Sequence, residues 1–385
     1  MNDEIIISAL STVSAFGSNR EALDEAIETK KIAMTFEHPY QRCTKSPLAF
    51  IAEHPYSDSL GTKQFGERLA AITTQLIGLL VEDSDVYGRY HPRRVGVMIG
   101  STTTGMSQTI KAVEIAKENS KDSGQASDEW KAVGKAVVRE VLQDNIFASL
   151  ESKFPVIGPR SIISTACSSG ALAVVEGARM IESGQVDCCI VGGVDVLTEI
   201  TIAGFSSLQL VDDDFCKPFR KDRKGLNLGE GGAFFLLERA STKPTKKIAR
   251  IFGSGVGTDV YHQTRPAPDG GIMEACMRST IQAVDPTQLP NFYINAHGTG
   301  TEANDLVERD AIERVFGSNA RFESTKRLHG HCLAGAGALE LAVSLGVLRR
   351  QLQSHPRQPA LAISNSFGFG GSCVSIGVES LEGRE

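Results

Sequence analysis

Long apolar runs are missing from this chain of 385 residues. No stretch approaches the ~20 consecutive apolar residues that a membrane-spanning helix needs. Residues 1–4 are acidic and run directly into three isoleucines, without the basic segment of a secretory signal or the Arg-rich helix of a transit peptide. We therefore expect a cytoplasmic protein that does not associate with a membrane.

The chain also has no excess of positive charge, and its cysteines are not regularly spaced. The 40 Lys and Arg residues are outnumbered by 46 Asp and Glu residues, so no large cationic field is available to bind nucleic acid. Eight irregularly spaced cysteines are typical of reduced thiols rather than of a disulfide framework. There is no Walker or dinucleotide-binding motif, and no histidine has partners at zinc-like spacing, so we predict no metal site.

Strand-like and helix-like segments alternate along the whole chain, which predicts an α/β layered fold. The length exceeds one ordinary core and favours two domains or two fused halves. Residues 118–129 are polar and read as an exposed loop. The predicted strands include 5–8, 95–99, 162–166, 189–193, 233–238, 292–295 and 360–364.

Two helices of small and apolar residues have the same design. One begins after Cys167 and the other begins at His331, and in each a glutamate follows at the same spacing, Glu176 or Glu340. A helix with so little polar surface must be buried. The similarity suggests two related halves packed face to face.

Cys167 follows a strand-like segment and heads the first of these helices. A thiol at a helix N-terminus lies near the positive end of the helix dipole, which lowers its pKa and favours the thiolate. The small residues at 168–171 leave room for a substrate. A lone cysteine would more often be a buried structural residue, but the surrounding motifs favour a nucleophile.

Two histidines are candidates to act with this thiol. His297 lies in a Gly- and Thr-rich loop, NAHGTGT, just beyond a predicted strand. His331 heads the second buried helix, where the dipole disfavours an imidazolium, so it should stay neutral and donate one N–H. The sequence leaves open whether His329 acts in place of His331. His297 or His331 could also be a structural histidine that takes no part in the reaction.

A glycine-rich turn, NSFGFGG at 365–371, follows the last predicted strand. Such a turn can direct backbone N–H groups at a developing oxyanion. In isolation the turn is a weak indicator, because glycine-rich turns are common.

The ordered set TACSSG, NAHGTGT, KRLHGH and NSFGFGG resembles the β-ketoacyl synthases of thiolase fold, in the Cys-His-His subgroup that elongates acyl chains on acyl carrier protein (ACP). The resemblance covers essentially the whole chain. It implies an α/β thiolase-like fold with two duplicated βαβαβαββ halves in a five-layered α-β-α-β-α sandwich. The N-terminal half, 1–240, would hold the nucleophile and inserted loops, and the C-terminal half, 241–385, both histidines.

The resemblance also implies an activity. The chain would be an acyltransferase that moves an acyl group to Cys167 and condenses it with malonyl-ACP by decarboxylative Claisen condensation. It would bind no cofactor but use phosphopantetheine thioesters carried by ACP. It would work as a homodimer, or as a heterodimer with a related ketosynthase-like subunit, in fatty acid or in specialised polyene or polyketide synthesis.

Residue roles follow from the same resemblance. Cys167 would be the nucleophile, and His297 and His331 would bind the malonyl thioester carbonyl and stabilise the enolate. The N–H groups of Cys167 and Phe369 would form an oxyanion hole, with Phe369 also gating the acyl pocket. The other matches are a charged network around the second histidine (Lys326, Glu308 and Asp305), a buried carboxylate (Glu340), and three threonines along the phosphopantetheine channel (Thr264, Thr299 and Thr301).

Two segments depart from the family pattern. In the loop 217–224, Arg220 and Lys224 stand where the family has acidic residues. The loop is either a solvated charge run or a basic strip that docks an acidic carrier or partner subunit. After the glycine turn, Ser372 and Cys373 replace the frequent Thr-Asn pair, which leaves carrier and substrate specificity open.

Two alternatives are kept. A thiolase would use a second cysteine as base, and Cys373 is the candidate. A noncatalytic chain-length subunit lacks the nucleophile, so the presence of Cys167 argues against that role for this chain. It leaves open a ketosynthase that works with such a subunit.

Overall fold

The computed structural model describes residues 3–51, 63–104, 144–282, 284, 292–356 and 358–382. The loop predicted at 118–129 lies outside these residues. Within the described part, ten strands form one mixed sheet in the order β3-β2-β4-β5-β1-β6-β10-β9-β7-β8. The strands are β1 (Ile5–Val13), β2 (Val95–Gly100), β3 (Arg160–Ile163), β4 (Cys188–Asp195), β5 (Gly231–Arg239), β6 (Ala249–Thr258), β7 (Tyr293–Asn295), β8 (Phe322–Glu323), β9 (Leu361–Phe367) and β10 (Ser372–Ser380).

The sheet consists of two five-stranded parts with the same topology. From the central pair outward, the order is β1-β5-β4-β2-β3 on one side and β6-β10-β9-β7-β8 on the other. On both sides the first two pairings are antiparallel and the last two are parallel. The two parts join through a short antiparallel pairing of β1 with β6. The predicted duplication is therefore confirmed.

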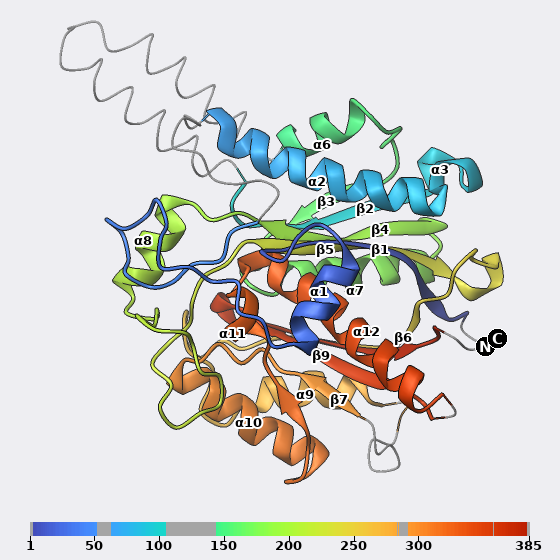
Figure 1. Cartoon of the computed structure of the whole chain (residues 1–385). Coiled ribbons are helices and arrows are strands. Elements are labelled where there is room, and N and C mark those ends of the chain that lie inside the picture. The colour runs from blue at the N-terminus through green and yellow to red at the C-terminus, as the bar shows by residue number, and fades with distance from the viewer. Residues whose placement is uncertain are drawn as a thin grey trace, which may run out of the picture.

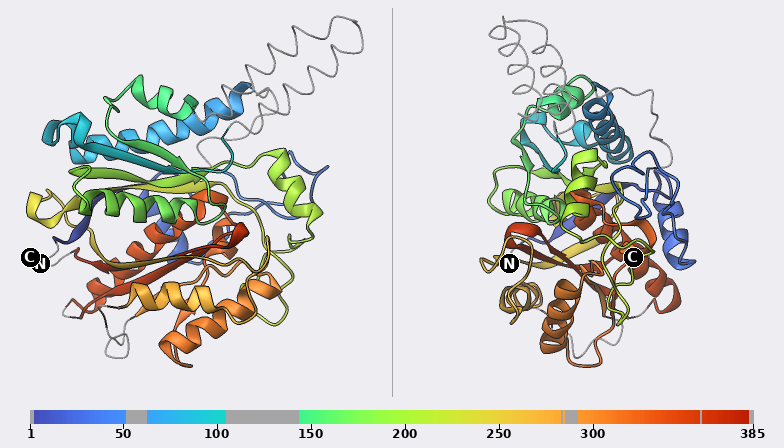
Figure 2. Two further views of the ribbon diagram at one scale, coloured as in Figure 1. Left: turned by 180° about the vertical axis from the view of Figure 1, so that it is seen from behind. Right: turned by 90° about the vertical axis from the view of Figure 1, so that its left-hand side faces the viewer.

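Helices cover and separate the two parts of the sheet in five layers (Figures 1 and 2). α2 (Lys63–Ser84) and α6 (Asp144–Glu151) form one outer layer, and α9 (Gly271–Thr280) and α10 (Glu302–Phe316) form the other. Between the sheets lie α7 (Ser169–Glu182) and α12 (Ala336–Ser354), which contact each other and strands of both parts. This arrangement confirms the predicted α-β-α-β-α sandwich. The remaining described helices are α1 (Arg20–Glu28), α3 (Val86–Arg89), α8 (Glu199–Ser207), α11 (Lys326–His329), η1 (Pro92–Arg94), η2 (Ala240–Thr242), η4 (Leu333–Gly335) and η5 (Phe369–Gly371).

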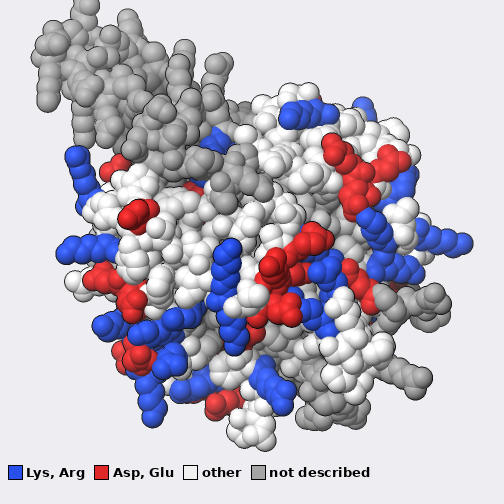
Figure 3. Space-filling view, in the orientation of Figure 1, with Lys and Arg blue, Asp and Glu red and all other residues white. Residues whose placement is uncertain are grey.

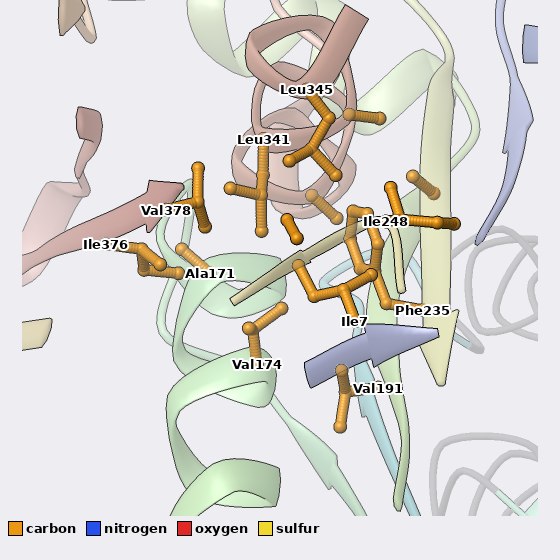
Figure 4. Packing of buried hydrophobic residues seen from close by; sticks show 14 of the residues in the cluster. Ile7, Ala171, Val174, Val191, Phe235, Ile248, Leu341, Leu345, Ile376 and Val378 are labelled. Atoms are coloured by element: carbon orange, nitrogen blue, oxygen red, sulfur yellow. The ribbon is translucent and has the colours of Figure 1, made fainter. Parts of the chain in front are cut away.

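The two middle helices are buried on nearly all sides, as their small and apolar sequences predict. Figure 4 shows Val174 of α7 and Leu341 of α12 within one cluster, together with Ile7 of β1 and Phe235 of β5. Both Ile7 and Phe235 are fully buried. The core therefore lies around α7 and α12 and fixes their positions relative to both sheets.

The N-terminal ends of α7 and α12 touch through their backbones. A Cβ atom on Gly170 would lie 2.7 Å from the carbonyl oxygen of Ala334 and 3.2 Å from the Cβ of Ala338. Reciprocally, a Cβ on Gly337 would lie 2.9 Å from the Cβ of Ala171. Glycine is needed at these positions because a side chain would separate the two helices.

The reciprocal contacts also correct how the two halves correspond. Gly170 matches Gly337, and the left-handed residues Ala166 (φ 52°) and Leu333 (φ 52°) match each other. A positive φ is uncommon for a residue with a side chain and marks a strained turn. The sequence analysis aligned the two helices by matching Cys167 with His331. The structure shows that this alignment is shifted by three positions. Cys167 and His331 nevertheless each lie just before the N-terminal end of one of the two helices, and these two helix ends touch.

The glycine contact predicts a specific loss of stability. Gly170→Ala should lower the free energy of unfolding by about 1–3 kcal/mol, because the methyl group overpacks the α7–α12 contact. Gly204→Ala in α8 is the matched control, since no atom lies within 4 Å of its Cβ position. That variant should be neutral or slightly more stable. Urea unfolding of both variants tests the prediction, and equal stability of Gly170→Ala and the wild type would contradict it.

Candidate active site

One cavity of about 320 Å³ brings together the reactive residues that the sequence predicts. Cys167, His297 and His331 all line it, and all three are at least nine-tenths buried. The rings of the two histidines lie 5.4 Å apart between centroids and are nearly perpendicular, at 82°. A thiol and two imidazoles can therefore meet one substrate.

Cys167 lies between β3 and α7, directly after the strained Ala166. The backbone N–H of Phe369 donates a hydrogen bond to its thiol. Burial raises the pKa of Cys167 to about 12, and the charge of Lys326 and the Phe369 N–H lower it by less. The prediction of a resting thiolate is therefore wrong: desolvation outweighs the helix terminus, and the thiol must give up a proton when it reacts.

Phe369 begins η5 at the mouth of a glycine turn and also lines the cavity. Its half-buried ring stacks on Phe205 of α8, with centroids 5.7 Å apart. Gly370 N–H donates to the Gln263 carbonyl at 2.8 Å, which ties the turn to the loop that follows β6. The Phe369 side chain thus lies on the cavity, and its N–H points at the Cys167 thiol.

His297 follows β7 and is held as a neutral donor. Its Nδ1 lies 3.4 Å from the Nζ of Lys326, and an ammonium group can only donate. Nδ1 is therefore the acceptor, and Nε2 carries the proton. Burial lowers the pKa of His297 well below its usual value, with further lowering by Lys326 and by His331.

His331, not His329, is the second cavity histidine. Burial lowers the pKa of His331 well below its usual value, and Lys326 lowers it further. His329 does not line the cavity, and both of its ring nitrogens have partners: Thr325 Oγ1 at 2.9 Å and the Gly330 carbonyl at 2.7 Å. Of the two alternatives that the sequence left open, this geometry favours His331.

Lys326 is fully buried behind His297 and does not line the cavity. Its Nζ donates to the His297 carbonyl at 2.6 Å and forms an ion pair with Glu340. Burial raises the pKa of Glu340, and the Lys326 charge partly offsets that increase. Lys326 and Glu340 thus act on the histidines through charge and position rather than by touching a substrate.

Glu308 and Asp305 of α10 organise the loop that carries His297. Glu308 accepts the N–H groups of His297 at 2.7 Å and of Gly298 at 2.8 Å, while burial raises its pKa to about 7. Asp305 accepts the Gly300 N–H at 3.1 Å. The resemblance implied that these carboxylates surround the second histidine, His331. The structure corrects this, because Glu308 and Asp305 instead hold the loop that carries the first histidine, His297.

The three predicted threonines line the same cavity. Thr299 and Thr301 share a hydrogen bond of 2.9 Å between their hydroxyl groups. Thr299 is buried, whereas Thr264 and Thr301 are half-buried. Cys373, the candidate base of the thiolase alternative, also lines the cavity, and burial raises its pKa.

Asp195, which the sequence analysis did not single out, holds the two halves together behind the site. This buried carboxylate at the end of β4 accepts hydrogen bonds from Ser101 Oγ at 2.7 Å and from the Ala334 N–H at 3.0 Å. The hydroxyl groups of Thr102 and Thr103 also donate to it. The only available signal was an acidic residue closing a strand opposite a Ser- and Thr-rich turn, and nothing in the sequence connects the two segments.

In the described ranges, no group of three or more His, Cys, Asp or Glu side chains is arranged to hold a metal ion. Among the same residues, no helix has the length and apolar character needed to cross a membrane.

The buried ion pair predicts separable effects on stability and activity. Lys326→Met should cost about 3–5 kcal/mol of unfolding free energy, because it leaves Glu340 buried without a counter-charge. Lys326→Met combined with Glu340→Leu should recover most of that loss. Turnover should stay low in the double variant, because His297 Nδ1 has lost its donor. Chemical unfolding and a turnover assay on the same samples test this, and recovery of turnover together with stability would show that Lys326 is only structural.

The chain matches two models of one protein family. The model of the β-ketoacyl synthase N-terminal domain matches residues 72–243, and that of the C-terminal domain matches residues 248–356.

Curated relatives agree with the family models. Nodulation protein E of Rhizobium sp. (strain N33) is 32% identical over 276 residues, which cover 69% of this chain and 63% of that protein. The 3-oxoacyl-[acyl-carrier-protein] synthase 2 of Staphylococcus aureus is 31% identical over 313 residues, covering 72% and 75%. The match thus spans less than two thirds of the first relative's length.

Solved structures share the fold. A chain of the complex of a ketosynthase (ApeO) with its chain length factor (ApeC) from Xenorhabdus doucetiae superposes with a TM-score of 0.77, 27% identity and 98% coverage of both chains. A β-ketoacyl synthase from Burkholderia phymatum STM815 gives a TM-score of 0.81 at 23% identity, covering 99% of this chain and all of that one. On the family models, which match most of its length, this chain belongs to the β-ketoacyl synthase family.

Proposed function

We propose that the protein is a β-ketoacyl-ACP synthase that joins an acyl group to a malonyl unit by decarboxylative Claisen condensation. The observation that carries the proposal is the single cavity lined by Cys167, His297 and His331. A Claisen condensation needs a sulfur nucleophile that is also a good leaving group, and neutral donors where enolate charge develops. The cavity holds both.

Acyl transfer would come first. The Cys167 sulfur attacks the thioester carbonyl of the acyl donor, the bond to the pantetheine sulfur breaks, and the thiol proton passes to that departing sulfur. Because the resting thiol is protonated, a neutral imidazole in the cavity is needed to relay the proton. The N–H groups of Cys167 and Phe369 would stabilise the oxyanion of the tetrahedral intermediate.

Condensation would follow on the acylated enzyme. Malonyl-ACP loses CO2, and the electron pair released forms an enolate whose oxygen accepts hydrogen bonds from His297 and His331. The enolate carbon then attacks the Cys167 thioester, the carbon–sulfur bond breaks, and the cysteine sulfur takes up one proton. Both histidines must be neutral N–H donors for this role, and burial and Lys326 favour the neutral form.

The partners belong to the same proposal. The name of the Staphylococcus aureus relative supports ACP as the carrier of both thioesters. Strand β3 forms one edge of the sheet and pairs only with β2 within the described residues, so its free edge offers a surface for a second subunit. That subunit is either an identical copy or a related ketosynthase-like chain, and the complex of the ApeO ketosynthase with its chain length factor ApeC supports the second arrangement. We place the enzyme in the cytoplasm, acting in fatty acid or in polyene or polyketide synthesis.

The division into halves at residues 240 and 241 is proposed as well. The last strand of the first five-stranded part, β5, ends at Arg239, and the first strand of the second part, β6, begins at Ala249. The boundary between the two parts therefore falls in the segment that joins these strands, which supports the division.

Mass spectrometry tests the proposed roles directly. The wild-type protein incubated with acyl-ACP should gain an acyl adduct on Cys167, and Cys167→Ala should gain none. His297→Ala and His331→Ala should each lower malonyl decarboxylation by about 10²-fold or more, since one oxyanion donor is lost, while acylation falls less.

Cys373→Ala is the control, because it removes the other cavity thiol. Retained condensation in this variant supports the synthase, and its loss would favour the thiolase alternative. A Cys167→Ala variant that still joins acyl and malonyl groups would contradict the assignment.

A further inference from the structure

The lining of the cavity changes character from its inner end to its mouth. Cys167 and the two histidines are buried, whereas Lys224, Arg265 and Glu302 line the same cavity and are exposed. The exposed residues therefore mark the opening. Two loops far apart in the sequence bring a cation each to this opening, where Glu302 is the exposed carboxylate. The carboxylate of Asp259 also lines the cavity, but it is buried and accepts two backbone N–H groups. Among the exposed lining residues, positive charges thus outnumber negative ones, on a chain whose overall charge is −6.

Three of the cations in the loop 217–224 have partners within the protein. Lys217 pairs with Asp222 at 3.2 Å, and Arg220 pairs with the same carboxylate at 3.2 Å. Arg223 is turned inward, where it donates to the Glu302 carbonyl at 3.1 Å. These three cations are therefore already engaged within the protein.

Three further cations lie on these two loops: Lys221, Lys224 and Arg265. In the part of the chain that the structure describes, no ion pair is found for Lys221, Lys224 or Arg265. Lys221 does not line the cavity, whereas the other two do. Figure 3 shows both signs of charge interspersed over the face drawn there, so this surface is not one continuous basic strip. Within the loop 217–224, Lys224 is therefore the cation to which the docking hypothesis applies, because it lines the cavity and has no ion pair among the described residues.

The backbones that carry both cations are fixed. Beside Lys224, a Cβ on Gly225 would lie 2.4 Å from the Leu210 carbonyl oxygen, and Leu226 N–H donates to that oxygen at 2.9 Å. On the other loop, the Asp259 carboxylate accepts the N–H groups of Tyr261 at 2.9 Å and of Ala267 at 2.7 Å. Only the ends of the two long side chains need to be ordered when a ligand binds.

We infer that Lys224 and Arg265 bind the phosphate group of a phosphopantetheine arm whose thioester reaches Cys167. This inference rests on the proposed function and extends it to a phosphate site at the mouth. A phosphate is the part of such an arm that remains near the protein surface once the thioester is inside, and paired cations recognise it through charge-assisted hydrogen bonds.

The test compares two small acyl donors that differ only in the phosphate: hexanoyl-phosphopantetheine and hexanoyl-pantetheine. The readout is the ratio of their kcat/KM values for acylation of Cys167, followed by intact-protein mass spectrometry. The wild type should prefer the phosphorylated donor. Lys224→Glu and Arg265→Glu should each lower that ratio by about fivefold or more, the factor that one charge pair near 4 Å contributes in water.

Lys221→Glu is the matched control, with the same charge change on the same loop outside the cavity. Its ratio should equal that of the wild type. Raising the salt concentration to about 0.5 M should shrink the wild-type preference, because the screening length falls. Lys224→Gln, which removes the charge without adding an acid, should give a smaller decrease in the same direction.

The outcomes separate this inference from the proposed function. If neither donor acylates Cys167, the proposed function fails. If both donors acylate it but the ratio is unchanged in Lys224→Glu, or falls equally in Lys221→Glu, the phosphate site is wrong. An effect of Lys224→Glu with hexanoyl-ACP but not with hexanoyl-phosphopantetheine would also overturn it, because the contact would then be with the carrier protein.

Discussion

The site depends on one packing constraint, the direct backbone contact between the N-terminal ends of α7 and α12. Gly170 and Gly337 permit that contact, and Ala166 and Leu333 take strained conformations beside it. The contact is possible because both helices are buried between the two five-stranded parts of the sheet. Each part alone supplies only some of the chemistry: the thiol comes from the first and both histidines from the second. Joining the halves at the glycine contact is what places Cys167 and His331 on one cavity.

The same burial sets the protonation states. Desolvation disfavours every charged form, so it raises the pKa of the Cys167 thiol and lowers the pKa of both cavity histidines. A buried Lys326 adds to the effect on the histidines, and Glu340 balances its charge. The inner end of the cavity therefore holds a neutral thiol and neutral imidazoles, which suits the stabilisation of a transient enolate better than the storage of a permanent ion. The exposed cations of the lining, Lys224 and Arg265, lie instead at the mouth.

Much of the fold could be predicted from the sequence, because alternating strand and helix signals are strong where buried strands are apolar, as in β1 and β4. Strands β6, β8 and β10 were not predicted. In β6, alternate positions are glycines, since Cβ atoms at Gly253 and Gly255 would lie 2.2 Å and 2.0 Å from backbone oxygens of α9. The cavity residues were predicted from the resemblance. The protonation of Cys167 was not, because it depends on how deeply the thiol is buried, and the carboxylates of α10 were assigned to the wrong histidine because that depends on three-dimensional proximity.

The pH dependence of decarboxylation tests the central claim, that burial keeps His297 and His331 neutral. The enzyme is first acylated, so that the cysteine proton plays no part, and CO2 release from malonyl-ACP is then followed from about pH 5.5 to about pH 8.5. Glu308, with a pKa of about 7, titrates in this range, and a parallel profile of Glu308→Gln isolates its effect. The account predicts a flat profile in that variant, because neither histidine takes up a proton. A rate that falls about tenfold per pH unit below the ordinary histidine pKa near 6.5 would contradict it.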